Sequence, residues 1–145
     1  MNSENVEPIS PAVPESSPLA GFGVNSFASD GIVSVPADAP LDEVAELMSN
    51  HGVHAVVVVD DSREPPVISD VDLIAAAASG QFDRLSAGDI AGTESISVDR
   101  NESLDRAAQI LAEHSVAHLI VRDEGRVPVG VLSTLDLARA ISGRP

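Results

Sequence analysis

The sequence repeats itself at a shift of 63 residues, and this duplication constrains the fold more than any other feature. Residues 34–60 (SVPADAPLDEVAELMSNHGVHAVVVVD) align without a gap on residues 97–123 (SVDRNESLDRAAQILAEHSVAHLIVRD). The identical positions of the first copy are Ser34, Val35, Leu41, Asp42, Ala45, His51, Val53, Val58 and Asp60. Each copy is one supersecondary unit with an apolar face that it cannot bury alone.

The hydrophobic spacing predicts the order β-α-β-β-α in each copy. Nearly continuous apolar runs at 53–59 and 116–121 are typical of strands buried on both faces. Short strands are expected at 32–35 and 95–98, and closing helices are expected at 71–78 and 135–141. Between them, each copy has one apolar helical face, formed by Leu41, Val44, Ala45 and Met48 in the first copy and by Leu104, Ala107, Ala108 and Leu111 in the second. The expected fold class is therefore α/β (α+β), with two tandem units.

The expected domain organisation is a tail and two domains. Residues 1–21 contain Pro8, Pro11, Pro14 and Pro18 among Ser and Glu, so we expect a disordered Pro/Ser-rich tail. The first domain is expected over residues 22–84 and the second over residues 85–145. A faint similarity between 24–28 (VNSFA) and 87–91 (AGDIA) marks where each domain begins.

Composition excludes several function classes. The net charge of −15 disfavours nucleic acid and membrane as partners, because both are negatively charged. The absence of cysteine excludes disulfides, thiolate metal sites and a Cys nucleophile. No secretory signal is recognisable, and the densest apolar run is too short to span a bilayer, so we expect a soluble cytoplasmic protein.

The C-terminal segment 127–141 (VPVGVLSTLDLARAI) places polar side chains where a strand gives way to a helix. Ser133 or Thr134 suits a helix N-cap, and Asp136 suits the positive end of the helix dipole. The same groups also suit a ligand, since a carboxylate accepts from both ribose hydroxyls and a helix N-terminus favours phosphate. The residues alone leave both interpretations open.

Residues 22–143 resemble a tandem pair of CBS domains, also called a Bateman module. The resemblance rests on the order of the elements, the length of the unit, the aspartates Asp60 and Asp123 that end the central strands, and the closing motif G-x-x-S-x-x-D. The resemblance implies two units around a pseudo-twofold axis, clefts that hold adenosine-containing ligands, and a homodimer. It also implies that Asp136 binds ribose and that Ser133 and Thr134 lie near phosphate. Gly130 is expected to let the strand approach the ligand closely, because glycine has no side chain.

The first copy departs from this pattern. It keeps Ser69 and Asp72 but carries Pro66 in place of the glycine, so its cleft wall is expected to differ. His54 takes the place at which the gamma subunit of AMP-activated kinase brings a histidine to phosphate. The second copy has Ala117 there and His118 next. We therefore group His54 with Ser69 and Asp72, and His118 with the second motif.

Metal binding and catalysis receive little support from the sequence. The pairs His51/His54 and His114/His118 have ligand-like spacing, but neither copy supplies a third and fourth ligand, so we expect no metal and no cofactor. No nucleophile elbow, P-loop or dinucleotide fingerprint is present, and we expect no enzyme.

The resemblance predicts a regulatory module that senses AMP, adenosine or S-adenosylmethionine and modulates an unknown partner protein in trans, because no effector domain accompanies the two units. The acidic charge disfavours metal-free ATP. The alternative is a ligand-free dimerisation or protein-interaction module with the same fold.

Overall fold

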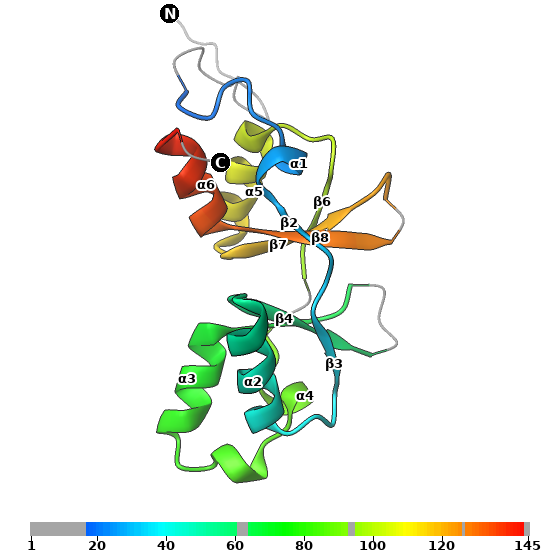
Figure 1. Cartoon of the computed structure of the whole chain (residues 1–145), viewed down its shortest axis with the longest axis vertical. Helices are drawn as coiled ribbons and strands as arrows, with labels where there is room; N and C mark the ends of the chain where they lie inside the picture. The colour runs from blue at the N-terminus through cyan, green and yellow to red at the C-terminus, as the bar shows by residue number, and fades with distance from the viewer. Residues whose placement is uncertain (1–16, 61–63, 93–94, 126, 144–145) are drawn as a thin grey trace, which may run out of the picture.

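A computed structural model describes residues 17–60, 64–92, 95–125 and 127–143, which form two sheets with helices packed against each (Figure 1). The expected order β-α-β-β-α is confirmed in both copies. The first unit contains β3 (Ser34–Pro36), α2 (Leu41–His51), β4 (Ala55–Val59), β5 (Val67–Ser69) and α3 (Asp70–Ala78). The second contains β6 (Ser97–Asp99), α5 (Leu104–His114), β7 (His118–Arg122), β8 (Pro128–Ser133) and α6 (Thr134–Ile141).

The strand register of one unit reproduces that of the other. β3 runs parallel to β4 and β4 antiparallel to β5, and β6, β7 and β8 are arranged in the same way. Val35 lies opposite Val58 in the first sheet, and their counterparts Val98 and Val121 lie opposite each other in the second. The sequence duplication is therefore also a structural duplication.

The leading segment of the first copy packs on the second unit. α1 (Val24–Phe27) is followed by β2 (Ser29–Asp30), which adds a fourth strand to the second sheet by pairing antiparallel with β8. Val24 is fully buried in the second core. The rings of Phe22 and Phe27 pack edge to face against this core, with 5.2 Å between the ring centroids. The chain crosses to the first sheet only after β2 (Figure 1).

The expected tail is shorter than the sequence suggested. Residues 1–16 lie outside the described part of the chain, but residues 17–21 lie against the second unit. Leu19 is 7% exposed and belongs to the second core, and the Ser17 hydroxyl donates to the Asp105 carboxylate. The prediction of disorder is wrong for residues 17–21, because Leu19 has apolar surface to bury there.

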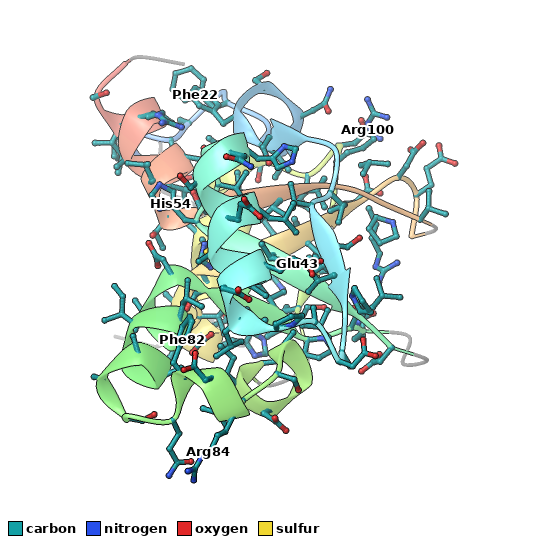
Figure 2. The ribbon with its side chains drawn as sticks, turned by 60° about the horizontal axis from the view of Figure 1, so that its bottom comes forward. Phe22, Glu43, His54, Phe82, Arg84 and Arg100 are labelled. Atoms are coloured by element: carbon teal, nitrogen blue, oxygen red, sulfur yellow. The ribbon has the colours of Figure 1, made fainter. Side chains whose placement is uncertain are left out.

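The segment between the two copies packs back on the first unit. It contains the short 3-10 helix η1 (Phe82–Arg84) and α4 (Ala87–Ile90). Ala87 is buried in the first core, and the Gly88 amide donates to the Ala37 carbonyl at 2.7 Å. Figure 2 accordingly shows Phe22 with the second unit and Phe82 with the first. Each unit is thus completed by the segment that precedes the other unit's repeat.

The buried residues of both cores are aliphatic apart from Met48, as the scarcity of aromatic residues requires, and Phe22, Phe27 and Phe82 are only partly buried against them. Within the described residues, no helix combines the length and the apolar character needed to cross a membrane.

Gly130 serves the pairing of β2 with β8. It lies opposite Asp30, and a Cβ atom at this position would come within 2.1 Å of the Ser29 carbonyl oxygen. The expectation that Gly130 lets the strand approach a ligand is therefore wrong, because the group that approaches closely is the backbone of β2. The first unit has no strand equivalent to β2 among the described residues, which is consistent with Pro66 in the matching position.

We predict that Gly130→Ala lowers the free energy of unfolding by about 1–3 kcal/mol, because the added methyl group must displace the backbone of β2. Urea denaturation measures the loss, and faster amide exchange at Gly31, which donates to the Val129 carbonyl, locates it. Gly23→Ala is the control, because a Cβ atom there meets its nearest neighbour at an ordinary 3.8 Å. Equal stability of the two variants would contradict this account of Gly130.

Candidate functional site

Two clefts lie between the units and correspond to each other through the duplication. The first cleft encloses about 150 Å³ and is lined by residues from 29–33, 52–55 and 131–139, together with His118. The second encloses about 250 Å³ and is lined by residues from 67–72 and 116–118, together with Gly92, Ser95 and Ile96. Each cleft combines the closing motif of one unit with the start of the central strand of the other.

The clefts group the predicted site residues differently from the sequence analysis. His54 lines the first cleft with Ser133 and Asp136, and Figure 2 shows its side chain near α6. Ser69 and Asp72 line the second cleft. The expected grouping of His54 with Asp72 is wrong, because the residues that precede β4 face the motif of the opposite unit. His118 lines both clefts.

Two predicted residues line neither of these clefts. Gly130 belongs to a separate hollow of about 70 Å³ beside Arg100. Thr134 is exposed at the first position of α6, where its amide donates to the Ala117 carbonyl at 3.0 Å. Both residues therefore contribute to the fold through backbone contacts and not to the lining of the clefts.

Asp136 is the central polar group of the first cleft, and its residue is only 7% exposed. Its Oδ2 atom accepts from the backbone amide of Ser133 at 2.8 Å and from the Ser133 hydroxyl at 3.0 Å. The Asp136 amide donates in return to the Ser133 hydroxyl at 3.2 Å, which completes a capping box. Oδ1 accepts from Nη1 of Arg139 at 3.1 Å.

The capping interpretation is thus realised, but capping alone does not identify a ligand site. The same serine–aspartate arrangement recurs at Ser69/Asp72, where it faces the second cleft, and at Ser86/Asp89, which lies in neither cleft. What distinguishes Asp136 and Asp72 from Asp89 is the cleft in front of them.

His118 lies at the junction of the two clefts, among charged groups from both units. Burial is the main influence on its pKa and lowers it below the ordinary histidine value of 6.5. His54 lowers the pKa further, whereas Asp70, Asp72 and Asp136 oppose the shift. His118 is therefore neutral at neutral pH. His54 lies on the first cleft, with Nδ1 3.1 Å from Oδ2 of Asp70.

Three polar residues of the clefts were not among those predicted from the sequence, namely Ser29, Arg139 and Ser95. Arg139 lines the first cleft, and its position three residues after Asp136 on one helix was a usable signal. Ser95 lines the second cleft, and its hydroxyl is buried without a hydrogen-bond partner in the described part of the chain. Nothing in the sequence pointed to Ser95, because the matching residue of the first copy is Ile32.

The histidine pairs do not form a metal centre in the described ranges, where no group of three or more His, Asp or Glu side chains has a suitable arrangement. His51 and His114 lie in the last turns of α2 and α5 and are exposed. Their position suits the negative end of a helix dipole.

Comparison with known proteins places these clefts in a family context. The family model of the CBS domain matches residues 24–78 and 87–143. The CBS domain-containing protein YhcV of Bacillus subtilis is 29% identical over 108 residues, which cover 74% of this chain and 76% of that protein.

Two solved structures show the same fold. The CBS domain protein PAE2072 from Pyrobaculum aerophilum, complexed with AMP, is 29% identical with a TM-score of 0.69, covering 83% of this chain and 95% of that chain. The CBS domain pair of protein MJ0100, in complex with 5-methylthioadenosine and S-adenosyl-L-methionine, has a TM-score of 0.72 at 20% identity. The match covers 84% of this chain and 97% of that chain.

We predict that His118 makes the free energy of unfolding fall as the pH drops below about 6.5. Below this pH the His118 imidazole is protonated more readily in the unfolded chain than in the folded chain, so acid favours unfolding. Above this pH the imidazole is neutral in both states, and it no longer affects the stability. Urea denaturation between pH 5 and 7 measures the slope, and an NMR titration of the imidazole gives its pKa. His118→Gln should reduce the slope; an unchanged slope would contradict the prediction.

Proposed function

This chain belongs to the CBS domain family and carries two such domains in tandem, and from this premise we propose that it is a regulatory module that binds an adenosine-containing ligand between them. Ligand binding then changes the activity of a partner protein in trans. The proposed role is regulatory and not catalytic.

The observation that carries this proposal is the Asp136 carboxylate, which is buried, held from two sides and part of the lining of the first cleft. A ribose presents two neighbouring hydroxyl donors, and an ionised carboxylate has about four acceptor positions on two oxygens. Oδ1 has only the Arg139 bond among the described contacts, so it retains acceptor capacity. The Asp136 carboxylate needs no rearrangement before a ligand binds, and this lowers the entropic cost of association.

The remaining walls suit an adenine ring. Val33, Val53, Val131 and Leu135 line the first cleft with apolar surface on which a flat base can pack. The relative PAE2072, 29% identical, is complexed with AMP, which supports the same ligand class for this chain.

We further propose that the module forms a homodimer through α3 and α6. The outer faces of these helices expose apolar side chains of which Val71, Ile74 and Ile141 are the most accessible. The apolar side chains of Leu137 and Ala140 on α6 are not available for dimerisation, because they are buried in the second core.

The ligand proposal predicts that Asp136→Ala weakens the binding of AMP roughly tenfold to a hundredfold. Hydrogen bonds to a charged group contribute about 1.5–3 kcal/mol, and every 1.4 kcal/mol is about tenfold in affinity. Isothermal titration calorimetry with AMP, adenosine and S-adenosylmethionine measures the change.

Asp89→Ala is the matched control, because it removes the same serine–aspartate cap from α4, outside both clefts. It should leave the affinity for AMP within about twofold of the wild-type value. Equal weakening by both substitutions would show that Asp136 acts only on the fold. The absence of binding by the wild-type chain at millimolar ligand would favour the ligand-free interaction module instead.

The dimer proposal predicts a homodimer at micromolar concentration in analytical ultracentrifugation, and a monomer after Ile74→Asp, because a carboxylate in that apolar face is unfavourable to bury. Val127→Asp is the control, since this exposed valine lies beside the β7–β8 turn and not on the helical face. A monomeric wild-type chain would refute the proposal.

A further inference from the structure

The two clefts differ in charge although their closing motifs match. Arg139 lines the first cleft, and the residue at the corresponding place on α3, 64 positions earlier, is Ala75. Of the described residues that line the two clefts, Arg139 is the only arginine, and the chain contains no lysine. The duplication therefore places a guanidinium beside one motif aspartate and not beside the other.

The charge of Arg139 persists at every pH at which the protein is folded, because a guanidinium does not lose its proton in proteins. The neighbouring His118 is neutral at neutral pH, since burial lowers its pKa. The lining of the first cleft thus balances Asp136 with Arg139, whereas the lining of the second presents Asp72 without an arginine. Among the described residues that line the clefts, an anion entering this chain of net charge −15 meets a compensating guanidinium only in the first cleft.

We propose that Arg139 is the specificity residue that makes the first cleft select a phosphorylated adenosine nucleotide, while the second cleft takes an uncharged or cationic adenosine compound. This inference rests on the proposed function, because it assumes that Asp136 holds the ribose of the ligand. A 5′-phosphate on that ribose then lies next to the helical turn that carries Arg139.

The geometry of Arg139 leaves donors for a phosphate. Its bond to Asp136 uses Nη1, which is one end of a planar group with five N–H donors. The side chain is 52% exposed and lines the first cleft, so the guanidinium has donors left for a ligand there. A guanidinium can hold a carboxylate on one edge and a phosphate on another, which a point charge does less well.

The second cleft offers different chemistry in place of this charge. The Ser95 hydroxyl is buried there without a partner in the described ranges, and a buried hydroxyl without a hydrogen bond is unfavourable. A ligand with an uncharged polar group satisfies this hydroxyl. The apolar neighbours Ile96 and Val116 add no charge.

The test is a calorimetric comparison of AMP with adenosine, which differ only by the phosphate. In a chain with Asp72→Ala, which weakens the second cleft, Arg139→Gln should weaken AMP binding roughly tenfold to a hundredfold and leave adenosine within about twofold. Arg139→Lys should restore part of the AMP affinity, because it keeps the charge. The same titrations without Asp72→Ala make the result independent of that variant's folding.

A reciprocal experiment transfers the charge to the second cleft. In a chain with Asp136→Ala, the substitution Ala75→Arg should raise the ratio of AMP affinity to adenosine affinity at least several-fold. The exposed position of Ala75 on α3 tolerates a long side chain.

Equal losses for AMP and adenosine after Arg139→Gln would overturn the inference, since Arg139 would then act only by positioning Asp136. Unchanged AMP affinity would overturn it as well. A wild-type chain that binds neither AMP, adenosine nor S-adenosylmethionine would instead refute the proposed function, and this result appears before any variant is made.

Discussion

The pairing of β2 with β8 is the interaction on which the rest of the structure depends. It holds the leading segment of the first copy against the second sheet, with Val24 buried behind it and Gly130 admitting the Ser29 carbonyl. The residues just after this contact then cross to β3 and form one wall of the first cleft. Without this pairing, the two repeats would be adjacent domains with an incomplete site between them.

The serine–aspartate capping box has two functions in this fold, and the first does not depend on the second. It satisfies the free amides at the start of α3, α4 and α6, as any helix requires. At α3 and α6 the box also lies on an interunit cleft, so a carboxylate needed for the helix is already in place for a ligand. The helix positions the side chain, and the opposite unit supplies its surroundings.

The duplication and the hydrophobic periodicity predicted both units, because helices such as α2 and α5 and the buried strands β4 and β7 are long enough to show a period. They did not predict the exchange of segments, since β2 has two residues and α1 and α4 have four each. The grouping of His54 with Asp136 could also not be predicted from the sequence, because it depends on how one unit faces the other. Arg139 was predictable from helical spacing alone.

The walls of the clefts differ where the capping boxes agree. His54 and Arg139 face the first cleft, and their counterparts in the other copy are Ala117 and Ala75. His118, whose counterpart is Ala55, reaches both clefts. Replacing an alanine by a charged or polar side chain at these positions leaves the capping boxes intact, so under the proposed function it alters the ligand preference without disturbing the helix. A duplicated fold of this kind can therefore acquire two different ligand specificities while each half keeps the same serine–aspartate hydrogen bonds at the start of its closing helix.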